Sequence, residues 1–267
     1  MKSIQELMNL TGRVAVITGG AGHLGQTFAE ALTELGAHVV LVDIQRDACE
    51  QAAQSLASKH SVPVLPIVLD LEKEEEILSL KDQIQKHFGR LDILINNSAF
   101  VGTSQLKGWG VPFDQQSSET WRRALEVNLT APFVLVQSCL DLLRASGHGS
   151  VINIGSTYGV VGPNMSLYEG TSMGNPAAYA ASKGGLIQLT RWMATNVAPN
   201  IRVNAISPGG IWRNQPEAFH QRYCKLTPMG RMASEQDFKG IIAFLASDLS
   251  EYVTGQNFMV DGGWTAW

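Results

Sequence analysis

Tyr179 and Lys183, four residues apart, are the pair in this sequence best suited to acid–base chemistry. Residues at this spacing lie on one face of a helix, so the phenol and the ammonium are expected to lie close together. A free tyrosine has a pKa near 10, about three units too high for a base at neutral pH, so about 4 kcal/mol of phenolate stabilisation is needed. A nearby cation supplies part of it. The pair predicts a catalytic tyrosine, and the alternative is a solvated helix face.

Ser156 is expected to complete this pair. It follows an apolar run at 150–155, and its hydroxyl could hydrogen-bond a substrate oxygen beside Tyr179. Tyr158 and Tyr168 also follow the serine, but neither has a lysine four residues later. Tyr179 is therefore the tyrosine predicted to act.

A glycine-rich turn, TGGAGHLG at residues 18–25, joins an apolar run to a helical stretch. Gly19 permits a tight turn, Gly22 lets backbone approach a pyrophosphate, and Gly25 lets the helix lie close to the strand. The start of the helix adds N–H donors for phosphate. The turn predicts a dinucleotide site, although such turns also serve packing alone.

The residues after the next apolar run favour NAD(H) over NADP(H). Asp43 ends that run, and a carboxylate there accepts hydrogen bonds from ribose hydroxyls and repels a 2′-phosphate. Ile44 carries no charge to neutralise such a phosphate, while Arg46 is close enough to leave the alternative open. An N-cap role for Asp43 would leave its spacing from the glycine turn unexplained.

The remaining predicted cofactor contacts lie at other strand ends and at the start of the first helix. His23 is expected at the edge of the phosphate site or partly in solvent. The other predicted cofactor-binding residues are Leu24, Asp70, Leu71, Asn97, Pro208, Gly209 and Ile211.

Apolar, β-branched runs alternate with helical stretches along the whole chain. The runs are continuously apolar, as in strands covered on both faces. This alternation predicts one doubly wound Rossmann-type α/β domain over residues 1–267, with a seven-stranded parallel sheet. The expected strands are 13–18, 38–43, 62–70, 91–96, 150–155, 201–207 and 257–262, and the expected helices are 24–36, 46–59, 72–88, 118–145, 177–197 and 234–247.

Three segments interrupt the alternation: 98–117, 157–176 and 208–230. They are rich in glycine, proline and polar residues and follow strand C-termini, where ligands bind in open α/β sheets. Loops this long are usually functional, so we expect them to be substrate loops.

Composition excludes several classes of protein. With 267 residues, 45% hydrophobic and 16% charged, the chain can bury a large core and is neither disordered nor a coiled coil. A net charge of −4 argues against a nucleic-acid partner. Three widely spaced cysteines favour reduced thiols, and no metal site is expected. With no apolar leader and no run of 18 apolar residues, a cytoplasmic protein without a membrane span is expected.

Further motifs complete a family pattern: VNL at 127–129, SPGG at 207–210 and TGQNFMVDGG at 254–263. Together with the glycine turn and Tyr179, the chain resembles the short-chain dehydrogenase/reductase family over essentially its whole length. The resemblance implies Tyr179 as general acid/base, Lys183 lowering its pKa and binding the nicotinamide ribose, and Ser156 orienting the substrate. It also implies that Asn128 holds a proton-relay water.

The same resemblance implies the reaction and the assembly. Hydride would move between a secondary alcohol or its ketone and C4 of the nicotinamide. A homotetramer or homodimer would form through the helices at 118–145 and 177–197, and the apolar C-terminal VDGGWTAW is expected near an interface or a neighbouring pocket.

Three features depart from the family pattern. The turn has the TGxxGxxG form of nucleotide-sugar epimerases, the interval from Ser156 to Tyr179 is unusually long, and Arg213 stands where a threonine is common. Arg213 could bind a substrate carboxylate or phosphate, or could be an exposed loop residue. We hypothesise that the extra polar residues bind a polyhydroxylated substrate: Asn164, Tyr168, Glu169, Thr171 and Asn175, with Tyr158 beside them.

The leading functional hypothesis is an NAD-dependent alcohol dehydrogenase acting on a sugar or sugar phosphate, as in a subgroup from bacterial surface-sugar and flagellin-glycan pathways. An NADPH-dependent ketone or 3-oxoacyl reductase is the alternative and would have a more apolar pocket. A catalytically silent nucleotide-sensing scaffold is the third, although such proteins typically lose the tyrosine or the lysine that this sequence keeps.

Overall fold

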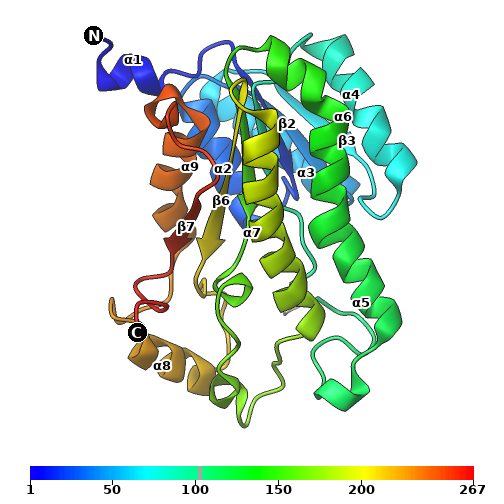
Figure 1. The fold of residues 1–267 in the computed structure, drawn as a ribbon, viewed down its shortest axis with the longest axis vertical. Helices are drawn as coiled ribbons and strands as arrows, with labels where there is room; N and C mark the ends of the chain where they lie inside the picture. The colour runs from blue at the N-terminus through cyan, green and yellow to red at the C-terminus, as the bar shows by residue number, and fades with distance from the viewer. Residues whose placement is uncertain (102–103) are drawn as a thin grey trace.

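The computed structural model describes residues 1–101 and 104–267. Seven parallel strands form one sheet in the order β3-β2-β1-β4-β5-β6-β7 (Figure 1). The first six follow the doubly wound Rossmann order, so the predicted fold is confirmed. The strands are β1 Val14–Thr18, β2 His38–Asp43, β3 Val64–Val68, β4 Ile93–Asn96, β5 Gly149–Ile154, β6 Ile201–Pro208 and β7 Asn257–Val260.

Helices cover both faces of the sheet, which explains why its strands are continuously apolar. Along β1, Val14 and Val16 pack against one helical layer, whereas Ala15 and Ile17 pack against the other. Pro66 lies in β3, an edge strand, where a missing backbone donor is tolerated. One layer contains α2 His23–Glu34, α3 Arg46–His60 and α9 Lys239–Ala246, and the other contains α4 Glu74–His87, α6 Ala131–Ala145 and α7 Ala177–Val197.

The helix expected over 118–145 is interrupted. It consists of α5 Ser118–Leu125 and α6, joined by a π-turn at Glu126–Thr130. By length and composition alone Ser118–Ala145 could cross a membrane, but half of its apolar window is buried inside the protein. Its apolar character is therefore explained by packing against the sheet.

The prediction of a loop throughout 208–230 is wrong, because α8 occupies Glu217–Leu226. Phe219 and Tyr223, four residues apart, form its buried face. Pro216 and the polar residues around α8 resemble a loop sequence, and only the tertiary contacts of its two aromatic residues reveal the helix. In Figure 1, α8 lies beside the C-terminus below the carboxyl ends of β6 and β7.

Short elements complete the fold. The N-terminal helix α1, Ile4–Met8, was not expected from the sequence and begins at a capping box formed by Ser3 and Glu6. Residues 102 and 103 of the predicted loop 98–117 lie outside the described residues. The 3-10 turns are Phe113–Gln115, Thr157–Gly159, Met165–Tyr168, Glu235–Phe238 and Asp248–Ser250.

Gly25 allows α2 to lie directly against the turn after β1. A Cβ atom at Gly25 would lie 2.1 Å from the Gly19 carbonyl oxygen. We expect Gly25→Ala to reduce the free energy of unfolding by about 2 kcal/mol or more, because backbone must move to relieve the overlap. Urea denaturation followed by circular dichroism measures this loss.

Gly240→Ala is the matched control, since Gly240 lies in α9 and a Cβ there meets nothing within 4 Å. This variant should be as stable as the wild type or more stable by up to about 1 kcal/mol. Equal stability of the Gly25 variant and the wild type would contradict the close approach of α2.

Candidate active site

Ser156, Tyr179 and Lys183 come together where β5 meets the start of α7. Ser156 follows β5 directly, and its hydroxyl hydrogen-bonds Tyr179. The Lys183 Nζ atom lies 6.0 Å from the centre of the Tyr179 ring and donates to the Ile154 carbonyl at 2.6 Å. Gly159 lets the turn after Ser156 pack closely against α7, because a Cβ there would lie 2.7 Å from the carbonyl carbon of Lys183. The structure therefore brings the three residues together.

Burial dominates the electrostatics of this site. It raises the pKa of Tyr179, which the hydrogen bond from Ser156 opposes, and it lowers the pKa of Lys183 to about 8. The protein's own groups thus leave Tyr179 protonated at neutral pH. Lowering its pKa to the working range requires a further positive charge next to the phenol.

Asn128 lies in the π-turn and anchors neighbouring segments to one another. Its Oδ1 accepts from the Phe100 backbone N–H at 2.8 Å, and its Nδ2 donates to the Phe100 carbonyl and to Ser182 Oγ at 3.0 Å. Both side-chain polar atoms are therefore used within the protein. Oδ1 can accept a second hydrogen bond, which leaves one side-chain acceptor for a relay water. π-turns are frequent at functional sites.

The glycine turn is built for close approach to a ligand. Gly19 has a φ of +62°, and Asn97 Nδ2 donates to the Thr18 and Gly19 carbonyls, which fixes the turn. Gly22 precedes α2 as its N-cap, so the first N–H groups of the helix are free for an anion. His23, the first residue of α2, is exposed to solvent.

A cavity of about 240 Å³ adjoins this turn at the ends of β2 and β3. Asp43 forms part of its wall and accepts from the N–H groups of Ala21 and Gln45, at 3.0 Å each. Arg46 points instead to Glu50, 3.3 Å away. The cavity is lined by Gly19, Val42, Asp43, Ile44, Leu69, Asp70, Leu71, Glu72, Ser98, Ala99, Phe100 and Val127.

Together the glycine turn and this cavity fit a dinucleotide. The turn offers free N–H groups without side chains in the way, and the cavity offers a carboxylate and apolar walls for an adenosine. Leu24 is half-buried and packs on the core, so only its backbone is placed to contact phosphate.

Pro208 is the last residue of β6, and Gly209 and Ile211 follow it, next to the end of β5. The Gly209 N–H donates to the Val260 carbonyl at 2.9 Å, and a Cβ at Gly209 would lie 2.8 Å from Asp261 Cα. Because β5 and β6 pair in register up to Ile154, this segment is level with Ser156. The predicted nicotinamide-side residues therefore lie beside the catalytic group.

The segment 157–176 supplies an aromatic cluster beside Tyr179. The Tyr158 and Tyr168 hydroxyls lie 2.9 Å apart, and the Asn175 amide donates to Tyr168. Tyr168 also raises the pKa of Tyr179, so these hydroxyls are close to the catalytic one. The buried residues of the cluster are Leu167, Tyr168, Phe219, Tyr223, Met232 and Trp264, and Tyr158 packs against them.

Sequence reasoning missed Tyr223 and Trp264 as parts of this site. Tyr223 comes from α8, and its hydroxyl accepts from the Gly210 N–H at 2.5 Å. Trp264 lies in the apolar C-terminal segment, which was the signal that could have pointed to it. Four of the five tyrosines of the chain thus gather here.

Two predicted substrate residues are exposed or already paired in the structure. The Glu169 side chain is exposed, and its backbone carbonyl accepts from Arg222 Nη1 at 2.5 Å. Arg213 forms an ion pair with Glu235, so its guanidinium already has a carboxylate partner. Neither arrangement supports the predicted role in binding substrate.

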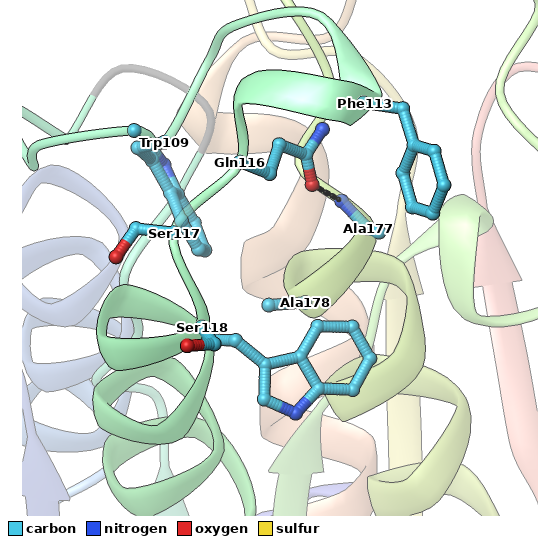
Figure 2. Close-up of a pocket in the computed structure, with 9 residues that line it drawn as sticks. Trp109, Phe113, Gln116, Ser117, Ser118, Ala177 and Ala178 are labelled. Atoms are coloured by element: carbon cyan, nitrogen blue, oxygen red, sulfur yellow. Dashed lines mark hydrogen bonds between the residues drawn. The ribbon is translucent and has the colours of Figure 1, made fainter.

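A second cavity, of about 360 Å³, lies between residues 108–121 and the start of α7 (Figure 2). Gln116 Oε1 accepts from the Ala177 N–H at 3.0 Å, which ties the predicted loop 98–117 to the first turn of α7. Trp109 is buried against Ala178, with Tyr179 packed alongside. This part of the loop positions the helix that carries Tyr179.

Comparison with known proteins agrees with this geometry. A family model described as Enoyl-(Acyl carrier protein) reductase matches residues 19–265. The NAD-dependent glycerol dehydrogenase of Listeria innocua is 32% identical over 99% of this chain and 98% of its own.

Two solved structures are also similar. The structure of NAD⁺-bound xylitol dehydrogenase has a TM-score of 0.85 and 30% identity, covering 95% of this chain and 99% of its own. A gluconate 5-dehydrogenase from Burkholderia cenocepacia, in complex with NADP and tartrate, has a TM-score of 0.88 and 29% identity, covering 99% and 100%. The chain belongs to the short-chain dehydrogenase/reductase family of oxidoreductases.

Proposed function

We propose that the chain is an NAD(H)-dependent dehydrogenase that interconverts a secondary alcohol and its ketone, with a sugar or another polyol as substrate. The observation that carries this proposal is the meeting of Ser156, Tyr179 and Lys183 beside a glycine turn that fits a dinucleotide. The similarity to glycerol and xylitol dehydrogenases supports the substrate class.

In this proposal Tyr179 moves the proton and its neighbours hold the substrate. Bound NAD⁺ supplies the hydride acceptor at nicotinamide C4 and a positive charge near the phenol. The Tyr179 oxygen takes the proton of the substrate hydroxyl, while the Ser156 hydroxyl hydrogen-bonds the same substrate oxygen. Lys183, fixed by the Ile154 carbonyl, adds its own positive charge and would bind the nicotinamide ribose.

The cofactor would be held along the carboxyl edge of the sheet. The turn at Gly19, Gly22 and Gly25 would take the pyrophosphate, and Asp43 with Ile44 the adenosine ribose. The proposed residues at the remaining contacts are His23, Leu24, Asp70, Leu71, Asn97, Pro208, Gly209 and Ile211.

A second candidate, an NADPH-dependent ketone or acyl reductase, is favoured by the description of the matching family model and by the NADP-bound neighbour. Asp43 argues against it, because its carboxylate lies on the cavity wall and Arg46 is paired with Glu50. Initial rates with NAD⁺ and NADP⁺ separate the two candidates.

We also propose that copies of the chain associate along α5, α6 and α7 into a dimer or tetramer. Exposed aromatic side chains support this, since Trp121, Phe133 and Trp192 on these helices are 38%, 38% and 56% exposed. Exposed large apolar side chains are more frequent at interfaces than on the rest of a protein surface.

Tyr179→Phe removes only the proposed proton-transfer group. We expect kcat to fall by about 10³-fold, within the range attributed to general acid–base catalysis, while NADH binding is retained. Steady-state absorbance at 340 nm and NADH fluorescence titration measure the two. Tyr252→Phe, at an exposed tyrosine, should behave as the wild type, and full turnover by the Tyr179 variant would refute the mechanism.

Asp43→Ser combined with Ile44→Arg replaces the carboxylate with a group that still accepts from the Ala21 N–H, and adds a cation for a 2′-phosphate. We expect the ratio of kcat/KM for NAD⁺ to that for NADP⁺ to fall by about 30-fold. Asp47→Ser, at an exposed position of α3, should leave the ratio unchanged. An unaltered ratio in the double variant would exclude Asp43 as the selecting group.

The buried ammonium makes stability depend on pH. Lys183 loses its proton near pH 8 when folded and near 10.5 when unfolded. Between pH 8 and 10 the unfolded chain therefore binds more protons, and stability rises with pH. Above about pH 10 the raised pKa of Tyr179 makes stability fall as the pH rises, because the folded chain keeps a proton that the unfolded chain loses.

We therefore expect the wild type to gain about 2 kcal/mol of unfolding free energy relative to Lys183→Met between pH 8 and 10. Urea denaturation at several pH values in this window measures the difference. Lys225→Met, at an exposed lysine, serves as control, and its unfolding free energy should change with pH as that of the wild type does. If the unfolding free energy of Lys183→Met also changed with pH as that of the wild type does, Lys183 would have an ordinary pKa in the folded protein.

A further inference from the structure

Two buried polar atoms beside the aromatic cluster have no hydrogen-bond partner. They are the indole Nε1 of Trp264, a donor, and the side-chain Oδ1 of Asn175, an acceptor. A buried polar atom left unsatisfied costs about 1–3 kcal/mol. Such atoms in a folded protein call for an explanation, and one explanation is a ligand that completes their bonds.

Both atoms connect to the catalytic tyrosine through a chain of contacts. The Trp264 ring packs edge-on against Tyr158 with ring centres 6.0 Å apart, and the Tyr158 hydroxyl lies 2.9 Å from that of Tyr168. Tyr168 hydrogen-bonds Asn175 at the other end. Both Tyr158 and Tyr168 interact electrostatically with Tyr179. The unsatisfied donor and acceptor therefore belong to residues that are linked, through Tyr158 and Tyr168, to the group that would hold the reacting oxygen.

Trp264 is held in place by its neighbours rather than loosely attached. Its ring stacks on Tyr223 at 5.7 Å with an interplanar angle of 13°. The preceding Gly263 has a φ of +87°, and Asp261 accepts hydrogen bonds from the Gly263 N–H and from the backbone and hydroxyl of Thr265. The indole N–H is therefore positioned in advance, as a recognition group must be.

The charges around the cluster point to a neutral ligand. Arg213 is paired with Glu235, and Arg222 donates to the backbone carbonyls of Ser166, Leu167 and Glu169. Burial raises the pKa of Tyr158 and, to about 12, that of Tyr223, so these phenols are uncharged at neutral pH. Arg213 thus already has a carboxylate partner, and Arg222 is held against the backbone of the loop through its Nη1 atom. A hydroxyl group both accepts from an indole N–H and donates to an amide oxygen.

We propose that Trp264 Nε1 and Asn175 Oδ1 form a hydrogen-bonding subsite for a further hydroxyl group of a neutral polyol whose reacting hydroxyl lies at Tyr179. The subsite rests on the proposed function and narrows its substrate class, from alcohols in general to uncharged polyols. It makes Trp264 and Asn175 specificity-determining residues.

Trp264→Phe tests the subsite, because it keeps a stacking ring and removes only the N–H and part of the indole. With NAD⁺ as cofactor, we expect KM for xylitol to rise about tenfold and KM for cyclohexanol, which has one hydroxyl, to stay within about twofold. Asn175→Ala should show the same split. Trp267→Phe, at a C-terminal tryptophan that is 79% exposed, is the matched control and should change neither value.

Equal rises in KM for the two alcohols would overturn the subsite and assign Trp264 a packing role. A wild-type preference for cyclohexanol or gluconate over xylitol would also overturn it, and both results would leave the dehydrogenase proposal standing. Failure of the wild type to oxidise all three compounds with either NAD⁺ or NADP⁺ would instead remove the proposed function.

A spectroscopic readout tests the subsite without turnover. The chain has six tryptophans, and the indole ¹⁵N–¹H resonance missing from Trp264→Phe identifies that of Trp264. Titrating xylitol into the NADH-bound wild type should move this resonance downfield to saturation, because the N–H gains an acceptor. An unmoved resonance at the highest xylitol concentration, or an equal shift with cyclohexanol, would refute the subsite.

Discussion

The buried ammonium of Lys183 is the constraint on which the rest of this site depends. It is 2% exposed, and it donates to a carbonyl oxygen of the protein, that of Ile154 at the end of β5. An ion in such a place is costly unless its surroundings satisfy it. The strand end, the start of α7 and the phenol of Tyr179 are arranged around it, so the position of one cation links the sheet to the proposed proton transfer.

The same burial creates an electrostatic balance. It raises the pKa of Tyr179 and lowers that of Lys183 to about 8, so at neutral pH the lysine stays charged while the phenol keeps its proton. Ser156 shifts the balance toward the phenolate through its hydrogen bond. A positive charge arriving with an oxidised cofactor would complete it, which would couple the basicity of the tyrosine to occupation of the neighbouring cofactor site.

Local patterns predicted the sheet well, because each strand is recognised from its own continuous apolar run. The helix over 177–197 was expected with the bounds that α7 has. The failures involve partners that are distant in sequence. α8 is recognised only through contacts of its buried face, and the pairing of Arg213 with Glu235 joins residues 22 positions apart.

In the candidate site, too, relations between residues close in sequence could be predicted, whereas contacts between distant residues could not. The spacing of Tyr179 and Lys183 encodes their shared helix face, so their proximity could be derived from the sequence. The engagement of Asn128 with Phe100 and Ser182 depends on the tertiary path of the chain and could not. Trp264 joins the aromatic cluster from the C-terminal segment. The sequence shows that this segment is apolar, but not that it packs against the cluster.

Asp43 has a second duty, with a consequence for how enzymes of this kind diverge. Its Oδ2 accepts from the Ala21 N–H inside the glycine turn, while Oδ1 accepts from that of Gln45. The carboxylate that would select NAD(H) therefore also stabilises the glycine turn, and this turn would bind the pyrophosphate that NAD(H) and NADP(H) share. A replacement that cannot accept from the Ala21 N–H would weaken this turn for both nucleotides, so an ancestor of this sequence would most easily have changed its electron carrier through a residue, such as serine, that keeps the hydrogen bond.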